Sequence, residues 1–396
     1  MYYICSAIIS IMMKKITTVL LILLFTPLCF SQSNFSWKGY FSFNEIKDVS
    51  QSPEKLYAAS ENALFSKNLA TNVIQSRNTI DGLSGETIST IYYSPENKKT
   101  LIGYENGLII VINEIDGKML NVVDIINKSI PANTKKVNHF MEYENIVYVS
   151  CDFGIVQYNL KTLQFGDTYF IGDGGALIAV SQTAIFQDNI YAATLNSGIR
   201  RALITNPNLN DYNQWTTITG GSWLGITAFN SKLYATANNG IVQELKGNLF
   251  TTLFTLPEVS VDFRSNSKYL VITTPNHVYL YNTTMVIESD IKKADIPDIT
   301  SNFTCATTID ATLFIGTFEN GLWSKNINET TFEDNTPNGT LRNNVFAINA
   351  ETANLWAVYG GYDLDYNPYP FYKNSPAKFG ISKYTNQVWL TIPYDD

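Results

Sequence analysis

One phrase recurs along the chain at nearly constant spacing: an apolar strand, a short polar turn that usually contains Gly, and a second short strand. With one turn residue of each copy as its anchor, seven copies stand at positions 63, 107, 154, 198, 240, 277 and 321. The steps between them are 44, 47, 44, 42, 37 and 44 residues. A chain of this kind repeats one small unit of antiparallel strands, because each copy holds two strands joined by a tight turn.

This spacing predicts a β-propeller, since blades of four short strands repeat at about 40 to 50 residues. A single blade has two apolar faces, and stacking blades in a ring buries both. Leading strands are predicted at 46–50, 88–93, 137–143, 184–187, 225–230, 259–265 and 303–309, and outer strands at 73–78, 165–171, 215–218, 250–256 and 331–334. No convincing amphipathic helix follows residue 31, so the predicted fold class is all-β, with seven blades.

An eighth copy is disguised by an insertion. Strands are predicted at 355–361, 379–384 and 388–392, with a tyrosine-rich loop at 362–378. We therefore divide the mature chain into a seven-repeat propeller, 32–340, and an eighth repeat, 341–396. An eight-bladed ring and the start of a truncated second propeller stay open as alternatives. Residues 35–43 have the character of an outer strand, and we expect them to pair with the last blade and close the ring.

The first 31 residues have the features of an export signal. Met13-Lys14-Lys15 is a short basic region, 16–30 is an apolar run, and Ser31 is a small residue at a plausible cleavage point. We expect translation to start at Met13 and the mature chain to begin at Gln32, with an uncleaved anchor as the alternative. No later segment has the roughly 20 apolar residues of a spanning helix. The predicted location is therefore outside the cytoplasm.

Charge and histidine content limit the function. The mature part has 25 basic and 35 acidic residues, a net charge of −10, which argues against nucleic acid as a partner. Its two histidines are His139, expected to be a hydrogen-bonded interior or edge residue, and His277, expected to tolerate unusual backbone angles in a turn. No Gly-x-Ser-x-Gly nucleophile motif occurs, so we expect a protein that is not an enzyme.

Cysteines and ligand-like loops indicate no cofactor. Cys151 and Cys305 belong to blades far apart in the ring, so we expect two small core residues rather than a disulfide. The glycine-rich stretch 172–175 lacks the Lys-Ser/Thr of a phosphate loop and is interpreted as a connection between blades. The stretch 363–367 begins like a calcium loop, but Pro368 stands where Gly must turn the chain. We predict neither a cofactor nor a metal.

Two features are candidate binding sites. The insertion in the eighth repeat crowds aromatic side chains among three prolines; these are Tyr362, Tyr366, Tyr369, Phe371 and Tyr372. Aromatic faces suit sugar rings or a partner surface, and an equally good interpretation is packing against further domains of a larger protein. Arg200 and Arg201 follow a turn glycine and could meet an anionic glycan, against the alternative of a solvated strand edge.

The repeats resemble two families. The repeat itself, with linkers such as Asp81-Gly82-Leu83-Ser84, is similar to the propeller repeat of extracellular sensors in hybrid two-component regulators. Residues 37–48, 366–370 and 391–394 resemble more specifically the N-terminal propeller of the PorZ-like proteins, which belong to the type IX secretion machinery of Bacteroidetes. The resemblance spans 32–396 and would cover the first half of such a protein. From this, and from the abrupt end at Asp396, we expect a partial reading frame.

The second resemblance implies a scaffold without catalysis, located in the periplasm or at the outer-membrane surface. It would work with the attachment-complex proteins of type IX secretion and bind or deliver anionic lipopolysaccharide. No binding residue carries over from the resemblance. Two other functions stay open: the periplasmic sensor of a hybrid two-component regulator, and a propeller polysaccharide lyase or glycosidase.

Overall fold

The computed structural model describes residues 38–360 and 380–392. This part of the chain forms eight antiparallel sheets of four strands each and contains no α-helix, which confirms the all-β prediction. Its helices are short 3-10 turns, none of them long or apolar enough to cross a membrane.

Seven sheets, called blades 1 to 7, follow one another along the chain. Blade 1 consists of β1 (Ile46–Gln51), β2 (Lys55–Ser60), β3 (Leu64–Asn68) and β4 (Ile74–Arg77), and blade 2 of β5 (Ile88–Ser94), β6 (Lys99–Tyr104), β7 (Ile109–Asn113) and β8 (Met119–Val122). Blade 3 consists of β9 (Val137–Tyr143), β10 (Ile146–Cys151), β11 (Gly154–Asn159) and β12 (Gln164–Tyr169), and blade 4 of β13 (Val180–Phe186), β14 (Asn189–Thr194), β15 (Ile199–Leu203) and β16 (Thr216–Thr219). Blade 5 consists of β17 (Trp223–Phe229), β18 (Lys232–Ala237), β19 (Ile241–Lys246) and β20 (Leu249–Thr255), and blade 6 of β21 (Asp262–Ser265), β22 (Leu270–Thr273), β23 (His277–Tyr281) and β24 (Ile287–Lys292). Blade 7 consists of β25 (Phe303–Ile309), β26 (Thr312–Thr317), β27 (Leu322–Asn326) and β28 (Glu333–Asp334).

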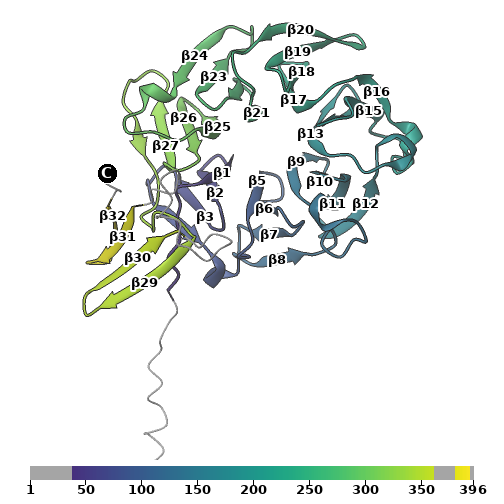
Figure 1. Cartoon of the computed structure of the whole chain (residues 1–396). Coiled ribbons are helices and arrows are strands. Elements are labelled where there is room, and N and C mark those ends of the chain that lie inside the picture. The colour runs from purple at the N-terminus through teal and green to yellow at the C-terminus, as the bar shows by residue number, and fades with distance from the viewer. Residues whose placement is uncertain (1–37, 361–379, 393–396) are drawn as a thin grey trace, which may run out of the picture. The chain divides into compact units, whose positions relative to one another are not determined.

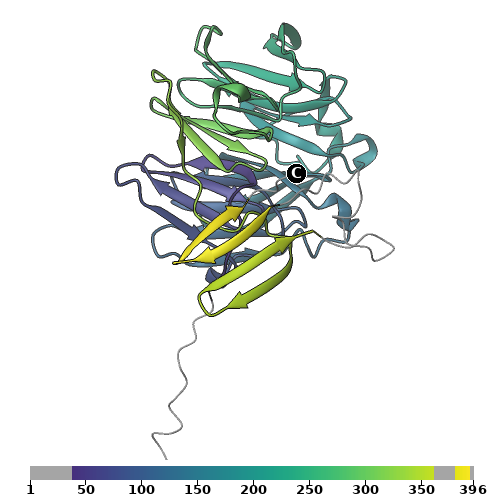
Figure 2. The ribbon, with the colours of Figure 1, turned by 60° about the vertical axis from the view of Figure 1, so that its left-hand side comes forward.

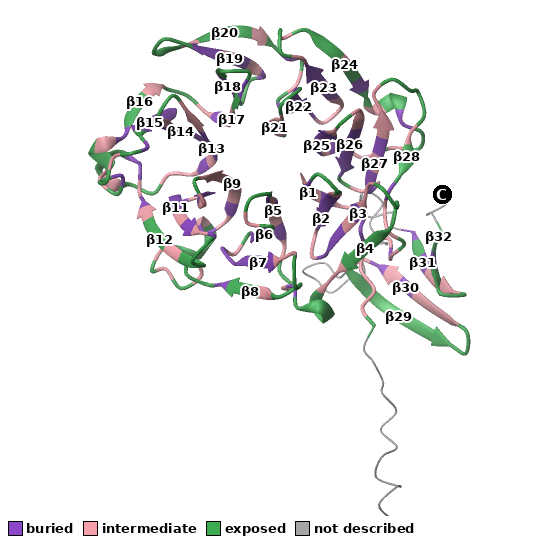
Figure 3. Cartoon of the chain, turned by 180° about the vertical axis from the view of Figure 1, so that it is seen from behind, coloured by how far each residue is buried: buried purple, intermediate pink, exposed green. Residues whose placement is uncertain are grey.

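The seven blades form a closed ring with the first strand of each blade at the centre (Figure 1). Each inner strand contacts the inner strand of the next blade, and β25 of blade 7 contacts β1 of blade 1. The hydrophobic clusters lie between neighbouring blades: Ile46 and Val49 of blade 1, for example, share a cluster with Phe314 and Leu322 of blade 7. Figure 3 shows the same layering, with exposed residues gathered on outer strands such as β8 and β20.

Strand prediction was better for inner than for outer strands. The leading strands at 137–143 and 303–309 are confirmed at both ends, whereas β13 begins four residues before its predicted start at 184. Two outer strands, β8 and β24, were not predicted at all. Outer strands are half exposed and carry charged or polar residues, so their apolar pattern is weak.

The predicted closing strand at 35–43 is wrong for the residues that the structure describes. Residues 38–44 form no strand, and β28 already fills the fourth position of blade 7. The segment instead lies beside the linker that leaves blade 7: Thr340 N donates to Phe41 O over 3.2 Å, and Ser42 N donates to Asn343 Oδ1 over 2.8 Å. Phe43 packs edge-on against Phe65 of blade 1, so side-chain packing ties this segment to the ring.

The eighth sheet consists of β29 (Val345–Glu351), β30 (Asn354–Tyr359), β31 (Ile381–Thr385) and β32 (Val388–Ile392). It takes no place among the seven blades (Figures 1 and 2). Its small core of Ala357, Tyr359 and Trp389 contacts Tyr40, whose ring centroid lies 5.2 Å from that of Trp389. Unlike the inner strands of the ring, β29 is exposed along its whole length.

Candidate functional site at the centre of the ring

A β-bulge near the start of most inner strands shapes the centre of the ring. Six of the seven inner strands shift register there, and β21 begins at the equivalent position. A bulge re-aims the side chains around it. The equivalent residues in blades 1 to 7 are Asp48, Thr90, His139, Gln182, Gly225, Asp262 and Cys305. All except Gly225 line a central cavity of about 150 Å³.

The extra residue of three of these bulges ties neighbouring blades together. Ser89 Oγ donates to the carbonyl of Val137 over 2.6 Å, so blade 2 is bonded to blade 3. Asn138 Nδ2 donates to Val180 O over 3.0 Å. Ser181 Oγ donates to Trp223 O over 2.9 Å. The bulge thus supplies a short polar side chain that bonds to the first residue of the next inner strand.

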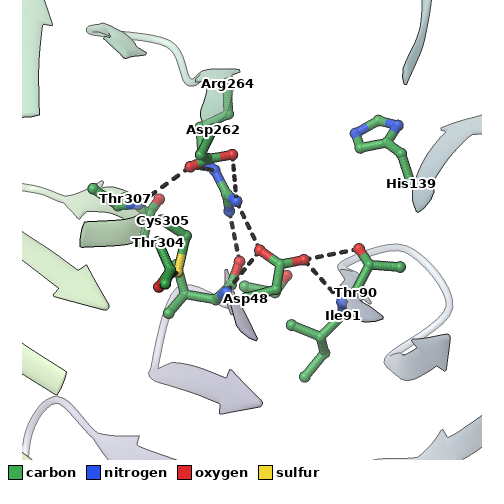
Figure 4. A network of polar contacts seen from close by, with 12 residues as sticks. Asp48, Thr90, Ile91, His139, Asp262, Arg264, Thr304, Cys305 and Thr307 are labelled. Carbon is green, nitrogen blue, oxygen red and sulfur yellow. Dashed lines mark hydrogen bonds and ion pairs between the residues drawn. The ribbon is translucent and has the colours of Figure 1, made fainter. Parts of the chain in front are cut away.

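An ion triad closes the ring at its centre (Figure 4). Arg264 of blade 6 donates from Nη2 to Asp48 Oδ1 of blade 1 over 2.7 Å and from Nε to Asp262 Oδ2 over 2.7 Å. Its Nη1 donates to Val49 O over 2.6 Å. Burial disfavours the charged guanidinium, but the carboxylates of Asp262 and Asp48 outweigh it and hold the pKa of Arg264 well above its usual value. The triad joins blade 6 to blade 1 across blade 7.

The two carboxylates of the triad are occupied by structural hydrogen bonds. Asp48 Oδ2 accepts from Thr90 Oγ1 over 2.8 Å and from Ile91 N over 2.9 Å, both in blade 2. Asp262 Oδ2 accepts from Ala306 N of blade 7 over 3.2 Å. A carboxylate held in this way by fixed donors has little capacity left for acid or base chemistry. We therefore assign the triad a structural role.

Gln182 makes the corresponding connection on the other side of the ring. Its Oε1 accepts from Ile226 N of blade 5 over 2.9 Å, and its Nε2 donates to Phe263 O of blade 6 over 3.0 Å. A Cβ at Gly225 would lie 2.9 Å from Gln182 Oε1 and 2.6 Å from Phe263 Cβ. Only glycine at 225 leaves the space for Gln182 to reach past blade 5.

His139 stands apart from the ion triad (Figure 4). Its Nε2 lies 3.2 Å from Gln182 Nε2, while its buried Nδ1 has no hydrogen-bond partner in the part of the chain that the structure describes. Burial lowers the pKa of His139 to about 4, so the ring is neutral at physiological pH. The predicted interior position is correct, but the expectation of a fully hydrogen-bonded imidazole is wrong.

Among the residues that the structure describes, those lining the cavity form no recognisable catalytic set. Burial raises the pKa of the Cys305 thiol, which therefore stays protonated. Within the described residues, no group of three or more His, Cys, Asp and Glu side chains is placed to hold a metal ion. Cys151 and Cys305 are both buried free thiols. The arrangement is suited to holding blades together.

The structure separates Arg200 and Arg201 from this centre, because both lie on β15, the third strand of blade 4. Arg200 is buried, and its Nη1 donates to Asp173 Oδ1 over 2.7 Å, so the alternative of a solvated edge is wrong for this residue. Asp173 belongs to the glycine-rich stretch 172–175, which connects blade 3 to blade 4 as predicted. Arg201 is half-buried and donates to Asn248 Oδ1 of blade 5 over 2.8 Å.

The remaining residues singled out from the sequence are the aromatic loop and His277. The aromatic residues Tyr362, Tyr366, Tyr369, Phe371 and Tyr372, like the calcium-like stretch, lie outside the described residues. His277 is not a turn residue with unusual backbone angles: it is the first residue of β23 and pairs with Lys292. Its Nδ1 lies 2.8 Å from Asp290 Oδ1, and its ring stacks on Tyr279.

Comparison with known proteins places the ring. The family model of the N-terminal β-propeller domain of PorZ matches residues 56–216, which span blades 1 to 4. A solved structure of PorZ, an essential bacterial surface component of the type-IX secretion system of Porphyromonas gingivalis, aligns with a TM-score of 0.72 over 90 % of this chain at 18 % identity. The ring is a PorZ-like β-propeller. The alignment covers 46 % of the PorZ structure, so the chain spans about half its length.

A designed protein shares the general architecture. The computationally designed Ika8 protein aligns over 81 % of this chain and 95 % of its own, with 11 % identity and a TM-score of 0.50. No curated protein matches the sequence.

Sequence reasoning missed the central residues of the PorZ-like ring. A signal was present: the third residue of six inner strands is Asp48, Thr90, His139, Gln182, Gly225 or Cys305, and each of these strands begins with a large apolar residue. The alternation of a regular strand predicts only which of the two sheet faces such a side chain lies on. The bulge, an irregularity in the pairing of two neighbouring strands, directs it into the cavity instead.

Proposed function

We propose that this protein is an exported, non-catalytic scaffold of the type IX secretion attachment machinery. The observation that carries the proposal is the agreement of the two comparisons, a family match across four blades and a structural match across 90 % of the chain, both to PorZ. PorZ is a surface component of that secretion system. Function at this level rests on similarity to a protein about twice as long.

The construction of the ring supports a scaffold. The ionisable groups at the centre bond to one another and to backbone groups of neighbouring blades, as with Asp48, Asp262 and Arg264. A rigid ring presents its loops in fixed positions, which suits recognition without bond chemistry. We therefore propose that the protein is not an enzyme.

The proposed ligand is either an attachment-complex protein or anionic lipopolysaccharide. A net charge of −10 on the mature chain requires a local site for an anionic glycan. Arg201 is the better cationic candidate of the pair, because the guanidinium of Arg200 is buried against Asp173. The aromatic residues of 362–372 remain the second candidate site.

The test is a calorimetric titration of residues 32–396 with purified anionic lipopolysaccharide, with a neutral polysaccharide as the control ligand. Saturable binding of the anionic glycan alone, weakened by added salt and by Arg201→Ala, supports the glycan function. Saturable binding that Arg201→Ala leaves unchanged moves the site away from β15. Absence of binding to a folded protein removes the glycan function and leaves docking to attachment-complex proteins.

We further propose that the eighth sheet is the first blade of a second ring. It has the four strands of a blade, but its inner strand has no neighbouring blade within the described residues. Its exposed apolar side chains are Val345, Phe346, Ile348, Ile381, Val388, Leu390 and Ile392. The strand register puts Ile381, Val388, Leu390 and Ile392 on one face of the sheet and Ile348 on the other. Apolar side chains exposed on both faces are typical of a blade that packs against neighbouring blades.

A further inference from the structure

The side-chain amide of Gln182 can be oriented from its neighbours. The backbone N–H of Ile226 needs an acceptor, so the atom 2.9 Å from it is Oε1. The carbonyl of Phe263 needs a donor, so the atom 3.0 Å from it is Nε2. Both bonds place the amide nitrogen, with its second hydrogen, against Nε2 of His139.

This orientation determines the tautomer of His139. Because Gln182 Nε2 donates, His139 Nε2 must accept, and an accepting ring nitrogen carries no hydrogen. A neutral imidazole has one N–H, which is therefore on Nδ1. The Nδ1 atom is buried at the central cavity and has no hydrogen-bond partner in the described protein.

We propose that the His139–Gln182 pair is an acid-sensitive contact that holds blades 3 to 6 together only while the imidazole is neutral. Protonation puts an N–H on His139 Nε2, directly against the N–H of the Gln182 amide. Turning the amide over gives His139 an acceptor, but it places an N–H group against Ile226 N and an oxygen against Phe263 O. Either arrangement loses contacts between blades, because one amide serves three partners.

The charged groups around His139 act in opposite directions. Burial has the largest effect and lowers the pKa to about 4; Asp48 on β1 favours the protonated ring, and Arg264 on β21 opposes it. Asp262 on β21 is bonded to Arg264, and the Cys305 thiol on β25 is neutral. The equivalent positions of β5, β13 and β17 are the uncharged Thr90, Gln182 and Gly225.

The direction of the pH effect follows from linkage. The unfolded chain takes up a proton on this histidine near pH 6.5, whereas the folded chain does so only near pH 4. The contribution is complete above pH 6.5 and is lost as the pH falls toward 4. The two pKa values of His139, in the unfolded and the folded chain, differ by about 2.5, and this difference corresponds to at most about a 300-fold decrease in the folding equilibrium constant.

The first test is urea unfolding of residues 32–396 between pH 7 and pH 4, with His139→Phe as the variant and His277→Gln as the control. Acidification weakens many carboxylate contacts, so the informative quantity is the difference between proteins. Between pH 7 and pH 4, the folding equilibrium constants of wild type and H277Q should decrease by a factor at least 30 times larger than that of H139F. Parallel losses in wild type and H139F would overturn the proposal.

A second test needs no variant at position 139. In ¹⁵N spectra of the wild-type protein at pH 7, the His139 signals should be those of the Nδ1–H tautomer, with H277Q assigning the ring. On acidification, the Ile226 amide should lose exchange protection at least tenfold more than the Ile91 amide, whose acceptor is the Asp48 carboxylate. An Nε2–H tautomer, or equal loss of protection at Ile91 and Ile226, would contradict the proposal.

Discussion

At the scale of single residues, the centre of the ring depends on size as much as on charge. Gly225 is the member of the central set without a side chain, and the space it leaves is used by Gln182 to reach blade 6. Arg264 similarly reaches past blade 7 to Asp48 of blade 1. Each connection joins blades that are not neighbours, so few residues hold much of the ring.

We expect Gly225→Ala to destabilise the fold by about 2 kcal/mol, because the new methyl group would meet Gln182 Oε1 at 2.9 Å and Phe263 Cβ at 2.6 Å. Gly220→Ala is the matched control, since a Cβ there meets no atom within 4 Å. Urea unfolding at pH 7 measures both free energies. Equal stability of the two variants would show that the centre yields easily to an added methyl group.

We expect Arg264→Met to lower the free energy of unfolding by about 3 kcal/mol, because it leaves the buried carboxylate of Asp48 and the half-buried carboxylate of Asp262 without their cation. Arg201→Met, on a half-buried side chain at the blade edge, should change the unfolding free energy by less than about 1 kcal/mol. Thermal and urea unfolding distinguish these outcomes. A loss below 1 kcal/mol in R264M would mean that the triad adds little to ring closure.

At the scale of elements, the bulge explains what periodicity could not. The inner strands were predicted well because their apolar residues repeat in every copy, as at 137–143. Their polar centre was not, because alternation assumes a regular strand, and the bulge between Val137 and His139 changes which side chain faces the cavity. His277 was misassigned for a similar reason: it stands at the glycine position of the repeat, yet it begins a strand and pairs with Lys292.

The exposed first strand of the eighth sheet, β29, gives a prediction at this scale. Ile348 on β29 is 68 % exposed, so Ile348→Lys should leave the unfolding free energy within about 0.5 kcal/mol of wild type and lower self-association. Ile46→Lys is the contrasting variant, because this inner-strand residue of the ring is fully buried and should not tolerate the change. Unfolding together with light scattering measures both effects. Strong destabilisation by I348K would show that β29 is covered in solution.

At the scale of the whole molecule, the seven-bladed ring should fold without the eighth sheet. The contact of β25 with β1 closes the ring, and the linker residues that bond to Ser42 end at Asn343. We therefore expect residues 32–344 to unfold in one cooperative transition, with the β-rich circular dichroism spectrum of the longer chain. Loss of cooperative unfolding would mean that the contacts of Tyr40 with Trp389 are needed to hold the ring.

The sequence by itself determined the all-β class, the repeat spacing and the seven regular repeats, because each blade must bury two apolar faces and therefore repeats its pattern. It left open whether the eighth repeat joins the ring. The tertiary structure alone decided how the ring closes and what lies at its centre. Closure comes from β25 against β1 and from Arg264 reaching Asp48, residues 216 positions apart in sequence. No local pattern encodes such a pair, because its energy arises only when the blades have already brought the two side chains together.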